Sequence, residues 1–336
     1  LRAQVAHPAP PAGAPAPAPP RWSARAALGT LGSLLALVAA CAVFATQSDR
    51  FLTGDNLALV LSQVMVVGVL AIGQTLVILT AGVDLSCGMA MALGQVVMTR
   101  LAVESGVSVP GAVALGLLAT TLVGLLNGAL VTLVRLPPFI VTLGTLNIAF
   151  AATQLYSDAQ TVTELPASLV ALGGTFPLAG TPVMHGVGVM LALYLLAWYA
   201  LRHTAAGRHV YAVGGAPEAA RLSGIRVGRV LVGVYALAGL LYGVAALLAV
   251  ARTGVGDPNA GQSENLDTVT AVVLGGTSLF GGRGLVLGSL VGALIVGVFR
   301  NGLTLMGVSS VYQVLITGVL VIVAVAADQL SRRGAR

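Results

Sequence analysis

Amide and hydroxyl side chains are scattered through the apolar stretches of this chain. Six of them form a candidate path for a solute: Gln63, Gln74, Asn127, Thr142, Thr145 and Asn147. Gln63 and Gln74 are eleven residues apart, about three helical turns, so they share one helix face. A neutral hydroxylated solute would exchange hydrogen bonds with such groups without being trapped. The alternative is hydrogen bonding between helices, the commoner fate of such residues one by one.

Charged residues are nearly absent from the apolar stretches, where each costs about 2.5–3.5 kcal/mol on insertion scales. Asp84 is the one acid close to the interior of such a stretch. We expect it to be the N-cap of a helix near the cytosol, rather than a substrate ligand. The chain shows neither a buried relay of Asp, Glu and His nor a nucleophile–base pair or metal cluster. This pattern argues against coupling to an ion gradient and against an enzyme.

A polar, basic segment at 202–229 separates two long apolar stretches. It holds five arginines and two histidines against one acid, Glu218. Gly214 and Gly215 break the chain, Pro217 suits a first helical position, and Glu218 lies where the helix dipole favours an anion. The segment therefore predicts a short helix offered to a soluble partner, or else a positive loop that only sets topology.

Composition requires a membrane protein, since 57% of the 336 residues are hydrophobic and 8% are charged, against about 25% charged in soluble domains. Ten apolar segments approach the length that crosses a bilayer, about 20 residues: 26–46, 56–80, 84–103, 110–134, 138–156, 183–201, 230–251, 268–281, 285–300 and 311–328. The eighth and ninth are short and glycine-rich, which favours half-helices or a re-entrant pair. The predicted fold is an all-α, polytopic transmembrane bundle of about ten spans (8–10).

Arginine placement sets the orientation of these spans. With the N-terminus inside, thirteen of the 17 basic residues fall on the cytoplasmic side, and Arg50, Arg100, Arg252 and Arg300 fall outside. Both termini and the segment 202–229 are therefore expected in the cytoplasm. Residues 1–25, rich in alanine and proline, predict a disordered cytoplasmic tail before a transmembrane domain at 26–330.

Two absences and one loop bear on partners. The chain has no lysine, so it cannot form the ATP-binding P-loop that requires one; any nucleotide must be bound by another subunit. The two cysteines lie in or beside apolar runs and indicate no disulfide framework. The expected outer loop places three acids, Asp257, Glu264 and Asp267, where a delivery protein could dock by charge complementarity or where water alone solvates them.

Several stretches resemble the permease subunits of bacterial ABC importers of the ribose, xylose and galactoside type. They are GQTLVILTAGVDLSCG (73–88), NGALVTLVRLPPFIVTLGT (127–145), GRHVYAVGGAPEAARLSGI (207–225), LDTVTAVVLGGTSLFGGRG (266–284) and GVFRNGLTLMGVSS (297–310). They cover most of the chain after the tail, in the family's order. The branched-chain amino-acid permeases are more distantly related and share less of these sequence motifs. Cys87, Gln74 and the proline-rich tail depart from the pattern.

The resemblance implies a homodimer in the bacterial inner membrane that does no covalent chemistry. A cytoplasmic ATPase would bind ATP and Mg²⁺ below, and a periplasmic or lipid-anchored sugar-binding protein would dock above. The partners implied are these proteins, a sugar and membrane lipid, with no nucleic acid. The residues EAA at 218–220 and the glycine at 224 are similar to the EAA---G coupling motif of import permeases. This resemblance assigns contact with the ATPase to Pro217, Glu218, Ala219, Ala220, Arg221 and Gly224.

The expected function is inward transport of a pentose or hexose driven by a separate ATPase. An ABC permease for a nucleoside or another polar solute is the first alternative. A stand-alone secondary carrier or channel is the second, and it would leave the segment 202–229 unexplained.

Overall fold

The computed structural model describes residues 24–333, and helices make up most of them. The apolar helices are α1 (Ala24–Gln47), α2 (Gly54–Leu79), α3 (Cys87–Val103), α4 (Val109–Ala129), α5 (Pro138–Ser157), α6 (His185–His203), α9 (Val227–Thr253), α10 (Glu264–Leu274), α11 (Val286–Leu305) and α12 (Ser310–Arg333). A π-helical turn, Leu130–Val134, extends α4. Two further helices, α7 (Ala205–Gly215) and α8 (Pro217–Leu222), lie between α6 and α9.

Six of the described helices are long and apolar enough to cross a membrane: α2, α4 with its π-helical end, α5, α6, α9 and α11. This pattern agrees with a multi-pass membrane protein. Each of the ten apolar segments contains a helix, but their lengths differ from the prediction. The third begins only at Cys87, and the eighth has just 11 helical residues. The ninth is no half-helix, because α11 runs for 20 residues.

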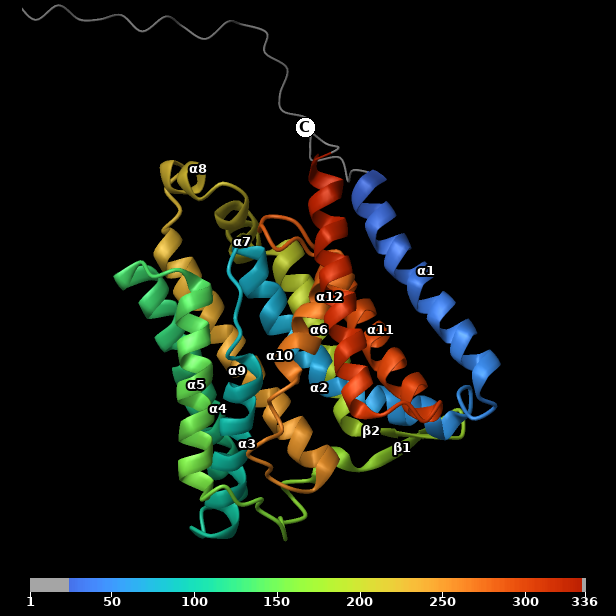
Figure 1. Cartoon of the computed structure of the whole chain (residues 1–336). Coiled ribbons are helices and arrows are strands. Elements are labelled where there is room, and N and C mark those ends of the chain that lie inside the picture. Colours follow the sequence, from blue (N-terminus) through green and yellow to red (C-terminus); the bar gives the residue numbers. More distant parts are fainter. Residues whose placement is uncertain (1–23, 334–336) are drawn as a thin grey trace, which may run out of the picture.

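One element departs from the predicted all-α class. Residues 175–184 form an antiparallel hairpin of β1 (Thr175–Leu178) and β2 (Thr181–Met184), with Phe176 opposite Val183. Gly180 takes a positive φ of 82° in the turn, which glycine adopts at little cost. The hairpin closes the bundle at the end opposite α8 (Figure 1).

The described ends of the chain lie on one side of the bundle. Figure 1 shows that α1 starts, α12 ends and α8 protrudes at the same end, whereas the loops after α3 and α9 lie at the other. The arginine-based topology predicts that the end with α8 faces the cytoplasm. Residues 1–23, most of the predicted tail 1–25, lie outside the described residues, and Ala24 and Arg25 begin α1.

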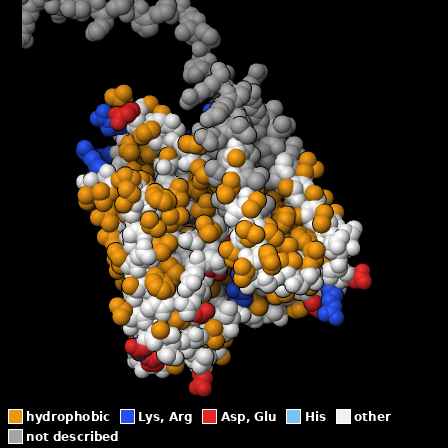
Figure 2. Space-filling view, viewed as in Figure 1, with side chains coloured by type: hydrophobic (Ala, Val, Ile, Leu, Met, Phe, Trp, Pro, Cys, Tyr) orange, Lys and Arg blue, Asp and Glu red, His pale blue; other side chains and the backbone are white. Residues whose placement is uncertain are grey.

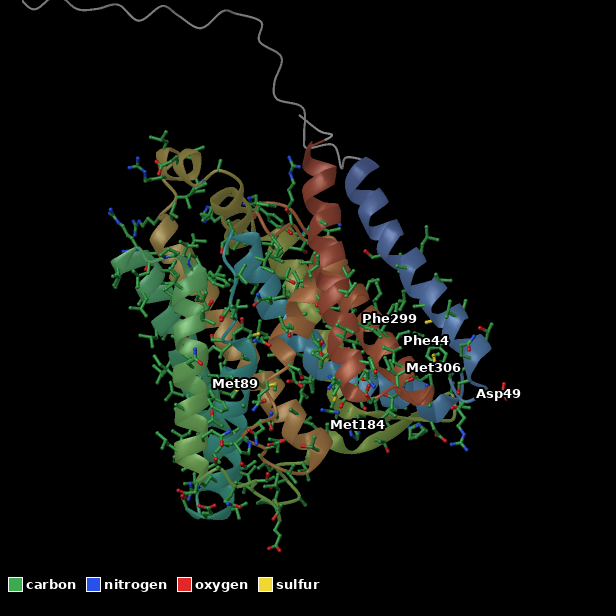
Figure 3. All side chains as sticks on the ribbon, in the orientation of Figure 1. Phe44, Asp49, Met89, Met184, Phe299 and Met306 are labelled. Carbon is green, nitrogen blue, oxygen red and sulfur yellow. The ribbon has the colours of Figure 1, made fainter. Side chains whose placement is uncertain are left out.

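The core is centred on α2 and α9. Gly124 and Gly128 of α4 let its backbone approach α9, because a Cβ at Gly124 would overlap the Tyr235 carbonyl oxygen. In the same way Gly288 and Gly292 of α11 lie against α10, whereas Gly284 precedes the helix. Phe44 of α1 meets Phe299 of α11 edge to face, with ring centroids 5.6 Å apart (Figure 3).

Polar pairs tie α2 to α11 at two levels. The amides of Asn56 and Asn301 exchange two hydrogen bonds of 3.0 and 2.8 Å. About five turns further along α2, the hydroxyls of Thr75 and Ser289 are 2.7 Å apart. All four residues are buried, so each polar group finds its partner across the helix contact.

Apolar side chains cover much of the outside of the bundle. Figure 2 shows them over broad areas of one face, with charged side chains gathered mostly toward its two ends. Leu133 and Leu155 are about four-fifths exposed, at 80% and 79%. Such a surface suits hydrocarbon, because its apolar side chains cost nothing there.

Candidate functional site

A non-helical segment, Thr80 to Ser86, enters the middle of the bundle between α2 and α3. Figure 1 shows the chain leaving α2 near α7 and running back before α3 begins. Asp84 is fully buried there and accepts a 3.2 Å hydrogen bond from the hydroxyl of Tyr242, which lies near the middle of α9. Asp84 is therefore neither near the end of the bundle nor the N-cap of α3, which is Ser86.

The Asp84 carboxylate is held on both oxygens. Oδ1 accepts from the Ser86 backbone N–H at 2.8 Å and from its hydroxyl at 2.6 Å, and Oδ2 accepts from Tyr242. A buried carboxylate is tolerated when donors replace the water it has lost. These bonds fold the segment into a turn and connect it to α9.

Four of the six predicted path residues surround this same segment: Gln74, Asn127, Thr142 and Thr145. When its amide is oriented to satisfy both groups, Gln74 donates from its nitrogen to the Asp84 carbonyl at 3.0 Å and accepts from the Asp84 N–H at 3.3 Å. The Thr142 hydroxyl donates to the Val83 carbonyl at 3.0 Å. The backbone of the segment thus obtains from side chains the partners that a helix would have supplied.

Asn127 and Thr145 extend the same network outward from Ser86. The Asn127 amide nitrogen donates to the Ser86 hydroxyl at 3.0 Å, and its oxygen accepts from Thr145 at 2.7 Å. Ser86, Asn127 and Thr145 are all buried. Their hydrogen bonds run between elements, as the alternative interpretation of these residues predicted.

The other two predicted residues lie elsewhere. Asn147 is exposed and donates to the Leu143 carbonyl of its own helix at 3.0 Å. Gln63 is half-buried, and its Oε1 has no hydrogen-bond partner among residues 24–333. Gln63 therefore has a buried acceptor without a protein partner, whereas both polar groups of the Gln74 amide are used.

The predicted short helix in the basic segment is present. Helix α8 starts with Pro217 at its first position, carries Glu218 in its first turn, and is followed by Gly224 at φ 84°. The exposed side chains of Glu218 and Arg221 form an ion pair of 3.0 Å. Ala220 is buried and Ala219 exposed, so one face of α8 packs on the bundle and the other faces outward.

Helix α7 was not foreseen in the sequence. Its N-cap Thr204 accepts from the Gly207 N–H at 3.2 Å, and the side of the helix with Val210, Val213 and Gly214 is buried. The sequence did contain an indication of this helix: Thr204, a favourable N-cap residue, precedes apolar residues at helical spacing. The glycines Gly207, Gly214 and Gly215 obscured it, because glycine disfavours helix interiors.

The acids of the predicted outer loop are less accessible than expected. Asp267 is only 6% exposed and pairs at 3.2 Å with Arg300 of α11, which is itself exposed, so Asp267 offers little carboxylate surface to a docking protein. Glu264 and Asp257 are half-buried. On the same side, Asp158 is exposed and pairs with Arg100 at 2.8 Å.

No three His, Cys, Asp or Glu side chains in the described part of the chain gather closely enough to hold a metal ion. The arrangement offers hydrogen-bonding groups, a protruding helix and apolar surface.

Comparison with known proteins places this architecture in a family. Residues 56–325 match the family described as "Branched-chain amino acid transport system / permease component". The fructose import permease of Rhizobium meliloti is 45% identical over 84% of this chain and 80% of its own length. The ribose import permease of Escherichia coli K12 is 41% identical over 92% of this chain and 96% of its own.

More distant relatives carry related names. The D-allose transport system permease of Escherichia coli K12 is 34% identical over 89% of this chain and 91% of its own length. No solved structure matches the chain. Since the family match spans most of the transmembrane helices, the chain belongs to the permease components of this transport family, in which the relatives named here are sugar permeases.

Proposed function

We propose that this chain is the membrane-spanning subunit of an ATP-binding-cassette importer that carries a monosaccharide across the cytoplasmic membrane. The sugar class follows from the relatives, whose names specify fructose, ribose, D-allose and galactose or methyl galactoside. A pentose or hexose is the common chemistry of that set.

The observation that carries the proposal is the exposed helix α8. The helix carries the exposed side chains of Glu218 and Arg221 and lies at the end of the bundle where α1 starts and α12 ends. A polar helix in this position fits a soluble partner on the cytoplasmic side. That partner is the ATPase subunit, which binds ATP and Mg²⁺ and moves α8; its contact comprises Pro217, Glu218, Ala219, Ala220, Arg221 and Gly224.

A sugar-binding protein docks at the opposite end, where the hairpin and the loop after α9 lie. Asp257 and, more weakly, Glu264 supply acidic contacts there, and the exposed Asp158 adds another. Two copies of the chain form the transporter through their apolar faces, with the sugar path at or near the contact between them. Gln63, with its unpartnered oxygen, is the residue we assign to that path.

The test is uptake by proteoliposomes that contain the permease, its ATPase and its binding protein. We expect uptake of one monosaccharide from a panel of ribose, fructose, allose and galactose, only when ATP and both partners are present. Uptake by the permease alone would indicate a carrier or channel, and exclusive uptake of a nucleoside or polyol would contradict the sugar assignment.

A further inference from the structure

The end of α7 meets two other segments backbone to backbone. A Cβ on Gly214 would overlap the Leu79 carbonyl oxygen and lie 2.8 Å from the Gly282 nitrogen. A Cβ on Gly281 would lie 2.8 Å both from the Ala81 Cβ and from the Gly214 oxygen. We name this contact among Leu79–Ala81, Gly214 and Gly281–Gly282 the glycine junction.

Hydrogen bonds fasten the junction. The Gly282 N–H donates to the Leu79 carbonyl at 2.9 Å, and the Tyr211 hydroxyl of α7 donates to the Gly284 carbonyl at 2.9 Å. Gly282 has φ 69°, a conformation that residues with a Cβ rarely adopt. Since backbones in direct contact leave no soft side chain between them, a displacement of α7 must displace both partners.

The glycine junction lies between helix α8 and the segment Thr80–Ser86. On one side α7 continues into α8 after a single residue, Ala216. On the other side Leu79 leads directly into Thr80–Ser86, where Asp84 is bonded to Tyr242 and the Val83 carbonyl to Thr142. The chain is therefore continuous or in backbone contact from the exposed helix to the middle of the bundle.

We infer that Gly214 and Tyr211 are positioning residues of transport, which pass the movement of α8 to the segment Thr80–Ser86 through the glycine junction. The inference rests on the proposed ATPase docking at α8. It adds a specific output for that movement: the Asp84 turn shifts relative to α9 and α5 when the ATPase changes state.

Two adjacent glycines provide a matched pair of variants. Gly214→Ala puts a methyl group into the Leu79 carbonyl, whereas a Cβ on Gly215 has only the Gly282 Cα within reach, at 3.8 Å, an ordinary contact. Both residues belong to α7, so the helix-propensity change is comparable. We expect Gly214→Ala to lower ATP-driven uptake at least about tenfold, within the usual range of coupling energies, and Gly215→Ala to preserve it.

The chain also contains its own reporter. Cys87 is fully buried and comes three residues after Asp84, and Cys41 is the one other cysteine. In a Cys41→Ser background, the maleimide labelling rate of Cys87 in the assembled complex should differ between the nucleotide-free and ATP-bound states. Gly215→Ala should keep that difference, and Gly214→Ala should abolish it while the ATPase still copurifies.

The inference is overturned if Gly214→Ala keeps normal uptake and nucleotide-dependent labelling, or if labelling in the Cys41→Ser parent ignores nucleotide. Should Gly214→Ala fail to insert, Tyr211→Phe decides, because it removes one hydrogen bond and keeps the ring. We expect it to lower uptake about fivefold, the weight of one ordinary hydrogen bond; unchanged uptake would refute the role. Glu218→Arg is scored separately by ATPase copurification, so a failure of docking is distinguishable from a failure of the junction.

Discussion

At the scale of single residues, Asp84 shows how a carboxylate is kept inside a bundle. Its donors come from its own turn and from α9, so the charge is offset locally and the turn is fixed in place. The same bonds leave little room for a sugar hydroxyl on this group. We therefore regard Asp84 as the residue that shapes the segment, and assign solute contact to Gln63.

Asp84→Ala should destabilise the protein by about 2–4 kcal/mol, because Tyr242, Ser86 and the turn lose their shared acceptor while remaining buried. Asp84→Asn should cost less, since one carbonyl oxygen remains. Thermal unfolding of the detergent-solubilised protein measures both. Asn147→Ala, on an exposed helix face, is the control and should change stability by less than about 0.5 kcal/mol; equal melting temperatures for all three variants would contradict the network.

Gln63→Leu and Gln74→Leu separate solute contact from structural support. Gln63→Leu should raise the KM for the sugar with little loss of stability, because its oxygen has no protein partner to lose. Gln74→Leu should lower stability and the rate of uptake, because the Asp84 backbone loses both of its bonds. Initial uptake rates across sugar concentrations provide the comparison, and the reverse assignment of effects would return Gln74 to the path.

At the scale of elements, the sequence predicted those helices that depend on residues within the helix itself. The short helix α8 follows from Pro217 and Glu218, and the long apolar helices follow from runs of apolar residues. A break between the second and third apolar segments was predicted at 81–83, but its extension to Ser86 and its place in the middle of the bundle were not, since TAGVDLS interrupts the apolar pattern only briefly. Its course depends on hydrogen bonds from Gln74 of α2 and Thr142 of α5. A local sequence pattern does not reveal such bonds between elements.

The candidate site, too, depends on contacts between elements that the sequence alone did not predict. The sequence grouped Gln74, Asn127, Thr142 and Thr145 with Gln63 and Asn147 as a solute path or as interhelical hydrogen-bonding residues, but it did not indicate that two of them bond the backbone of Thr80–Ser86. Only the tertiary structure reveals that its carbonyl and N–H groups need side-chain partners.

Helix α8 is the element whose change should uncouple the transporter. Glu218→Arg replaces the ion pair with Arg221 by a like-charge pair at a helix start, and Gly224→Pro demands a negative φ where the chain has 84°. We expect both variants to insert normally and to lose most ATP-driven uptake. Membrane abundance is the control, and normal uptake in either variant would argue against docking there.

At the scale of the whole molecule, the distribution of charge and apolar surface predicts an orientation in the membrane. The start of α1 and the end of α12 lie at the same end of the bundle as α8 and carry basic residues that favour the cytoplasm, among them Arg25, Arg332 and Arg333. The hairpin and the loop after α9 lie at the opposite end. Ten passes, the predicted count, would bring both ends of the chain to the same side.

A reporter fused after Arg336 should therefore give a cytoplasmic signal. The same reporter inserted after Asn259, an exposed residue in the loop after α9, should give a periplasmic one. Paired fusions to alkaline phosphatase and a fluorescent protein measure both positions. Equal signals at the two sites, or a periplasmic signal after Arg336, would overturn the topology.

The two polar pairs between α2 and α11 restrict how this protein can change shape. Sliding one helix along the other would break the Asn56–Asn301 and Thr75–Ser289 bonds together, and would leave their polar groups without water to replace them. The two helices therefore behave as one rigid unit, joined by hydrogen bonds near both ends. We expect the proposed transport cycle to move α2 and α11 as one unit, with changes of angle at the turns that lead into Thr80–Ser86 and out of Gly281–Gly284.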